Sequence, residues 1–162
     1  MNKYLKTLEL DKILQMLASH ASNAETRRMA LELRPDNDLE RVRYECLKTS
    51  QALELSVQYG TPPFSDFKDV TSSAARAASG AVISLRDLMD IAAMLRQIKG
   101  LADWYAHCEN AETELSYLFS RLQPNEWLLE KLERSIISDT EIADAASPEL
   151  AARRRKINKA GL

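Results

Sequence analysis

Four consecutive cationic residues near the carboxyl end of the sequence are the residues best suited to bind another molecule. They lie in the segment 148–162, which holds five Lys or Arg and one acid, whereas the rest of the chain holds 17 Lys or Arg against 23 Asp or Glu. Such a cluster either solvates the outer face of a coiled-coil arm or contacts the phosphates of a nucleic acid. Because the main part of the chain is acidic and only its carboxyl end is basic, the chain is predicted to contact nucleic acid at one local site at most. The four residues are Arg153, Arg154, Arg155 and Lys156.

The remaining reactive residues predict no catalytic, cofactor or metal site. The histidines, His20 and His107, fall on different predicted helices, and the cysteines, Cys46 and Cys108, form no CxxC unit. His107 and Cys108 are neighbours on a helix and point in different directions, so no thiol–imidazole pair is expected. The four glycines are too dispersed for a phosphate-binding loop.

Acidic and aromatic residues have simpler structural interpretations. The pair Asp87 and Asp90 suits the first turn of a helix, where the helix dipole favours negative charge. Trp104 and Trp127 are interpreted as core or interface residues and not as a base-stacking platform, because no basic groove is evident around them.

The composition predicts an all-α fold, a helical bundle of about six to eight helices. Hydrophobic residues make up 45% of the 162 residues and aromatic residues only 6%, with four Gly and five Pro, which favours helices joined by short connections. Apolar spacing and capping residues predict helices at roughly 7–21, 22–33, 38–59, 66–79, 84–105, 115–122, 128–136 and 147–162.

Local signals place the ends of several helices. Ser22 and Glu25 have the spacing of a capping box, in which two residues satisfy each other's backbone N–H groups. Ser84, with Asp87 three residues on, predicts the start of the helix at 84–105. The segment 136–143 departs from the helical pattern and predicts a small β-hairpin around a polar turn.

The last helix has a strong start signal but little apolar surface. Ser147 supplies a cap and Pro148 suits the first helical position. Only Leu150 and Ile157 are large and apolar, so we expect the helix not to fold against its own domain. It is predicted to be the start of a long antiparallel or coiled-coil arm that continues beyond Leu162, which makes the chain a piece of a longer protein.

No membrane association is expected. The longest uninterrupted apolar run, residues 91–95, is far shorter than a bilayer span, and Glu9 and Asp11 interrupt the apolar centre that a signal peptide would need. The expected compartment is the cytoplasm.

The order of several short motifs resembles the N-terminal part of the type-two branch of the MutS family (MutS-II), whose members end in an Smr nuclease domain. The resemblance covers essentially the whole chain. The matching segments are 7–14, 17–18, 21–22, 30–33 with Pro35, 52–53, 62–63, 85–88, 91–92, 95–96, Asp144 and 146–150.

The resemblance implies functions that these residues do not show by themselves. Full-length members are ATPases and endonucleases that act on branched DNA and suppress recombination, or that bind and split stalled ribosomes through rRNA. ATP and Mg²⁺ are implied for the full-length protein, as is a homodimer through its ATPase domain. No cofactor is implied for this segment.

By this resemblance, residues 1–146 form the first half of the helical core and residues 147–162 form the root of a lever helix. Ser147 and Pro148 would be the hinge, and residues 153–156 the first nucleic-acid contacts. The segment would link the ATPase to a clamp without catalysis of its own. The alternative is a stand-alone helical adaptor that binds a partner helix in a groove.

Overall fold

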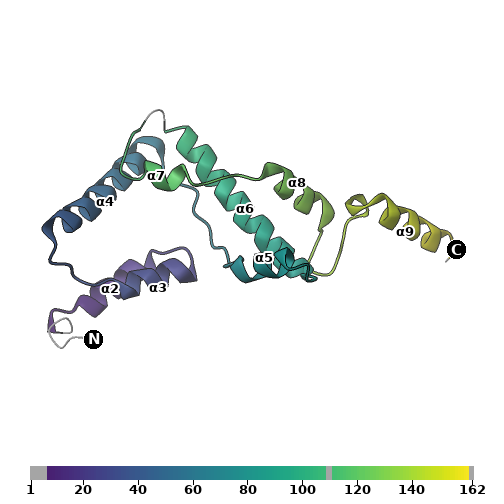
Figure 1. Ribbon diagram of the computed structural model, residues 1–162, viewed down its shortest axis with the longest axis horizontal. Helices are drawn as coiled ribbons and strands as arrows, with labels where there is room; N and C mark the ends of the chain where they lie inside the picture. The colour runs from purple at the N-terminus through teal and green to yellow at the C-terminus, as the bar shows by residue number, and fades with distance from the viewer. Residues whose placement is uncertain (1–6, 109–110, 161–162) are drawn as a thin grey trace. The chain divides into compact units, whose positions relative to one another are not determined.

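The computed structural model describes residues 7–108 and 111–160 and confirms the all-α prediction. Residues 1–6 and 161–162, at the outer ends of the predicted domains 1–146 and 147–162, lie outside the described residues. Eight α-helices and one short 3-10 helix, η1, occur in the described residues, with no β-strand (Figure 1). They are α2 (Leu10–Ser19), α3 (Ala24–Glu32), α4 (Leu39–Tyr59), α5 (Thr71–Ala78), α6 (Leu85–Ala106), α7 (Ser116–Phe119), α8 (Glu126–Ser135), η1 (Asp144–Ala146) and α9 (Pro148–Ala160).

The chain divides into two compact units. The first comprises Met1–Asp66 and Trp104–Arg121, and the second comprises Phe67–Asp103 and Leu122–Leu162. The predicted boundary between residues 146 and 147 lies inside the second unit and stays a prediction. No described helix is long and apolar enough to cross a membrane.

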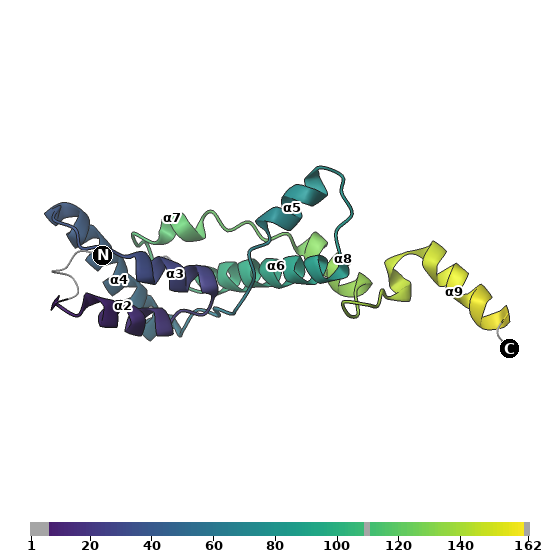
Figure 2. The ribbon, with the colours of Figure 1, turned by 90° about the horizontal axis from the view of Figure 1, so that it is seen from below.

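In the first unit, α2 and α3 form a helical hairpin and lie side by side in both views (Figure 1 and Figure 2). Leu14, Ala18 and Ala30 are buried. The predicted capping box of Ser22 and Glu25 is wrong, because the side chain of Asn23 caps α3 by accepting from the Thr26 N–H at 2.9 Å. Asn is at least as good a cap as Ser, so the neighbouring residue competes successfully.

Also in the first unit, polar contacts join α4 to the last turn of α6 and to the segment before α7. Asp38 caps α4, and Gly60 ends it with a φ of 83°. The Trp104 indole N–H donates to the Gly60 carbonyl at 3.2 Å, and the Glu114 N–H donates to Gln51 Oε1 at 2.8 Å.

The second unit has its core between α6 and α8. Ala92 of α6 and Leu129 and Leu132 of α8 are buried together. Partly buried side chains surround them: Leu88, Ile91, Leu95, Leu128 and Ile136. Several of these belong to the apolar stripe that predicts α6 from the sequence, so the helical period and the buried face agree.

Asp87 joins α5 to α6 through a buried serine. Its carboxylate accepts from the Ser84 hydroxyl and from the Ser73 hydroxyl of α5, both at 2.7 Å, and Arg76 lies 3.0 Å away. The Asp87 N–H donates to Ser84 Oγ and the Ser84 N–H donates to Asp87 Oδ2, so the two residues form a capping box at the predicted start of α6. The hydroxyl groups of Ser84 and Ser73 stabilise the charged carboxylate and hold the pKa of Asp87 well below its usual range.

The segment predicted as a hairpin is a tight turn with one β-bridge. Ile136 and Ile142 form a single antiparallel bridge, and the Ala143 N–H donates to the Ser135 carbonyl at 2.8 Å. The position is as expected, but the pairing stops after one bridge and no strands form. Ser138, Asp139 and Thr140 occupy the bend, and the turn leads the chain back along α8 into η1.

Replacing Leu132 by Ala is expected to destabilise the second unit by about 2–5 kcal/mol, because it leaves a cavity between α6 and α8. The midpoint of urea unfolding, followed by circular dichroism, measures the change. Ile157→Ala is the matched control, since Ile157 is 68% exposed and should change stability by less than about 0.5 kcal/mol. Equal effects of the two substitutions would contradict the assigned core.

Asp87→Asn is expected to lower the melting temperature at neutral pH more than at acid pH. Because folding lowers the pKa of Asp87, its stabilising effect is complete above the unfolded-state pKa of about 4 and is lost as the pH falls through the lower folded-state value. The difference in melting temperature should therefore be constant from pH 7 to about pH 5 and become smaller, without vanishing, between about pH 4 and pH 3. Asp139→Asn, in the exposed turn, is the control and should change the melting temperature at neutral pH only slightly.

Candidate nucleic-acid interface

The start of α9 follows the sequence signal. The Leu150 N–H donates to Ser147 Oγ at 3.1 Å, and Pro148 is the first residue of the helix. Ser147 itself is extended, with φ −155° and ψ 147°, and is the single residue between η1 and α9. The start of the helix is therefore confirmed, whereas the hinge role of Ser147 and Pro148 stays a prediction.

No residue of α9 is buried in the described part of the chain. Leu150 is half-buried near η1, which α9 contacts, but Ile157 is 68% exposed. The apolar surface of α9 is thus too small to fix it by hydrophobic packing, and its polar contacts determine how it is held.

The four predicted cations are brought together on α9 but differ in their partners. Arg153 pairs with Glu149 one turn earlier at 2.6 Å, and Arg154 pairs with Asp144 of η1 at 2.6 Å. Within residues 7–108 and 111–160, Arg155 and Lys156 form no ion pair, and both are exposed. Arg154 therefore ties the helix to η1, whereas Arg155 and Lys156 present their charge to solvent.

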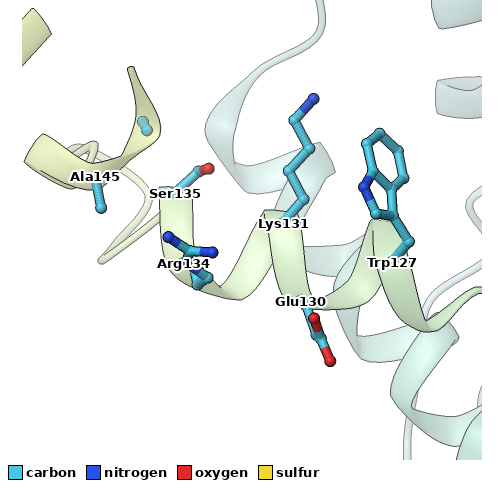
Figure 3. Close-up of a pocket in the computed structure, with 7 residues that line it drawn as sticks. Trp127, Glu130, Lys131, Arg134, Ser135 and Ala145 are labelled. Atoms are coloured by element: carbon cyan, nitrogen blue, oxygen red, sulfur yellow. The ribbon is translucent and has the colours of Figure 1, made fainter. Parts of the chain in front are cut away.

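A second cationic feature lies on the neighbouring helix, α8. Trp127, Lys131 and Arg134 line a pocket of about 260 Å³ whose other walls include Ala145 and Ala146 of η1. Figure 3 shows Lys131 and Trp127 projecting from the same side of α8, while the carboxylate of Glu130 points the other way. The Lys131 ammonium lies 4.7 Å from the centre of the Trp127 ring, within the range of a cation–π contact.

Trp127 is interpreted from the sequence as a core or interface residue. The structure excludes the core position, because the Trp127 side chain is 68% exposed, whereas the interface position stays a prediction. The positions of Trp127, Lys131 and Arg134, spaced by four and three residues, place them on one face of a helix. That spacing was the available signal. The sequence does not reveal a pocket there, because the opposite wall of the pocket is formed by η1, which follows the turn.

Comparison with known proteins identifies the chain's relatives. No family model matches it. A protein of Acetivibrio thermocellus is 36% identical over 162 residues, and one of Lachnospira eligens is 33% identical over 153 residues. A third, from Clostridium perfringens, is 29% identical over 160 residues. All three are named endonuclease MutS2, and the matches cover 98%, 94% and 98% of the chain.

The chain belongs to the MutS2 family. The resemblance predicted from the sequence is thereby confirmed. The chain spans about one fifth of the length of these curated relatives, with coverages of 20%, 19% and 20%.

Of the two cysteines of this MutS2 segment, Cys46 is exposed and Cys108 is buried. The Cys108 Sγ donates to the Trp104 carbonyl at 3.4 Å, and burial raises the pKa of the thiol. A raised pKa favours the protonated and less nucleophilic form at neutral pH. Among residues 7–108 and 111–160, no three His, Cys, Asp or Glu side chains gather as metal ligands would.

Ser147→Ala is expected to weaken the first turn of α9 by about 1 kcal/mol, since it removes the side chain that accepts from the Leu150 N–H. Amide hydrogen exchange over residues 149–160 should become faster, while exchange in α6 should not change. Ser147→Asp, which retains a capping oxygen, should keep the slower rates. Exchange in Ser147→Ala that matches the parent chain would show that the cap does not stabilise α9.

Proposed function

We propose that this segment is a helical scaffold of a MutS2-type protein that links an ATPase to a clamp and directs α9 toward nucleic acid. The proposed partner is branched DNA or the rRNA of a stalled ribosome. The observation that carries the proposal is the state of α9, which has no buried side chain in the described residues and two exposed cations without ion-pair partners. Exposed Lys and Arg on a helix bind phosphates and can release the counterions that surround them.

The attachment of α9 suits a lever. Ser147 caps the helix and the Arg154–Asp144 ion pair connects it to η1, so the root of α9 is held by polar contacts. Exposed ion pairs contribute roughly 0–1 kcal/mol each, so such a joint can rearrange at low cost. Packed helices that move as units are a common means of passing a conformational change between distant sites.

The first unit supports the scaffold part of the proposal. Large apolar side chains of α2, α3 and α4 remain exposed, among them Ile13, Met29, Leu53 and Val57. Exposed apolar surface of this extent is typical of faces that bind other protein. In the proposal, parts of a MutS2-type protein outside this segment cover these faces and supply the ATPase, its ATP and Mg²⁺, the homodimer contact and the nuclease.

A free-standing adaptor is the second candidate, favoured by one observation. Leu17, Met29 and Leu33 line an apolar pocket of about 370 Å³ between α2 and α3. An amphipathic helix of a partner inserts apolar side chains into grooves of this kind. If the pocket serves the scaffold, a separately produced remainder of a MutS2-type protein should bind the chain, and Met29→Glu should abolish that binding. If that remainder fails to bind, the adaptor function is favoured.

Changing the four cations of α9 (residues 153–156) to Ala is expected to weaken binding to branched DNA or rRNA and to reduce its dependence on salt. Each lost phosphate contact lowers the slope of log affinity against log salt by about one unit. Loss of the contacts of Arg155 and Lys156 alone would thus change the slope by about two. Fluorescence anisotropy between about 50 and 200 mM salt, with a labelled four-way junction and a labelled rRNA hairpin, measures this and distinguishes the two partners.

The matched control for the basic cluster changes four exposed arginines of the first unit, Arg27, Arg28, Arg41 and Arg43, to Ala. This control removes the same total charge. If both quadruple variants bind equally, net charge alone accounts for binding. If the α9 variant binds like the parent chain, the contact role is withdrawn and the scaffold role remains.

A further inference from the structure

We propose that the pocket between α8 and η1 binds one unpaired nucleotide of a nucleic acid, with Trp127 stacking on the base and Lys131 and Arg134 binding its phosphate. The inference deepens the proposed function and rests on it, because η1 connects the pocket to the α9 contacts. It adds a base-binding subsite to a surface that otherwise offers only phosphate contacts.

The ring of Trp127 is unusually exposed for a tryptophan. It is 68% exposed and lies outside the α6–α8 core, although Leu128 and Leu129 next to it pack inward. Exposed tryptophans are uncommon because their burial is strongly favourable. A tryptophan at the rim of a pocket therefore suggests a partner with a flat, apolar face, and every nucleobase has such a face.

The cations beside the ring are not neutralised. Lys131 lies over the Trp127 ring at 4.7 Å, and Arg134 lies one turn further along the same pocket. In the described part of the chain, neither side chain has an ion-pair partner. Glu130 is the one acid among the residues lining the pocket, and its carboxylate points away from Lys131 (Figure 3).

A second cation–aromatic pair in the chain shows what a purely structural contact looks like. On α4, the Lys48 ammonium lies 5.1 Å from the centre of the Tyr44 ring, with the same four-residue spacing. Lys48, however, is paired with Glu45 at 2.7 Å. An acid thus neutralises the cation of the α4 pair, whereas the α8 pair keeps its positive charge available for an anion.

The walls and size of the pocket fit a single nucleotide better than a larger ligand. The backbone hydrogen bond from Ala143 to Ser135 and the Ile136–Ile142 bridge hold η1 against the end of α8. The small side chains of Ala145 and Ala146 leave an opening of about 260 Å³, somewhat below the range of about 300–1,000 Å³ that is usual for sites of drug-sized ligands. A base that is stacked within a duplex cannot enter, so the nucleotide must be unpaired.

The test uses Trp127 as its own reporter. In a Trp104→Phe background, Trp127 is the sole tryptophan of the chain. Its emission is followed while oligothymidylate, oligouridylate or a duplex of equal length is added, and anisotropy of labelled oligomers reports total binding. The deoxy and ribo arms distinguish DNA from RNA as the source of the nucleotide.

The expected result is saturable quenching of Trp127 by at least one single-stranded oligomer and little by the duplex. Trp127→Ala should weaken single-strand binding by about 5- to 100-fold, the usual range for loss of one stacked base, while Trp127→Phe should retain most of it. Arg134→Ala and Lys131→Ala should each lower the salt slope by about one unit. Tyr44→Ala, the matched control on α4, should leave binding unchanged.

The possible failures separate this inference from the proposed function. Oligomers that bind without changing Trp127 emission, and with equal affinity for Trp127→Ala, would overturn the pocket and leave the α9 contacts intact. Equal quenching by the duplex would overturn the requirement for an unpaired base. If Trp127 is quenched but the quadruple α9 variant binds normally, the α9 contact fails and the pocket stands. If no nucleic acid binds the chain, both are overturned.

Discussion

The packing of α8 on α6 through Ala92, Leu129 and Leu132 determines where the chain can turn toward α9. Burial of these side chains removes apolar surface from water, which is the largest favourable contribution to folding of the second unit. Two ion pairs, Arg96–Glu133 at 2.6 Å and Lys99–Glu126 at 3.1 Å, border the same contact. At the end of α8, held in place by this packing, the Ser135 carbonyl accepts a hydrogen bond from the Ala143 N–H. This bond holds the start of η1 against α8.

Everything beyond α8 is held by polar contacts of small individual energy. The bridge of Ile136 and Ile142, the ion pair of Arg154 and Asp144 and the cap of Ser147 follow one another along the chain. In the proposed function, α9 moves as an arm because it is attached by weak polar contacts and not by an apolar core. The α8 pocket and the α9 cations lie on either side of η1 along the chain, and in the proposed function one nucleic-acid strand contacts both.

The local elements could be predicted largely because their signals are short in range. Asp38 with Gly60 and Ser84 with Asp87 define the ends or starts of α4 and α6 from residues that are close in sequence. The errors arose where two local solutions compete. Asn23 replaced Ser22 as the cap of α3, and the turn at 136–143 formed one bridge because nothing extends the pairing on either side.

The sequence by itself determined the helical class, the starts of the main helices, the family and the four clustered cations of α9, because each depends on composition, period or adjacent residues. Only the tertiary structure decided that Arg154 is paired with Asp144 while Arg155 and Lys156 are not, and that Trp127 faces solvent beside Lys131. Both facts depend on the turn that brings η1 back beside α8. The contacts that stabilise this arrangement join residues that are not adjacent in the sequence, so local patterns do not reveal them.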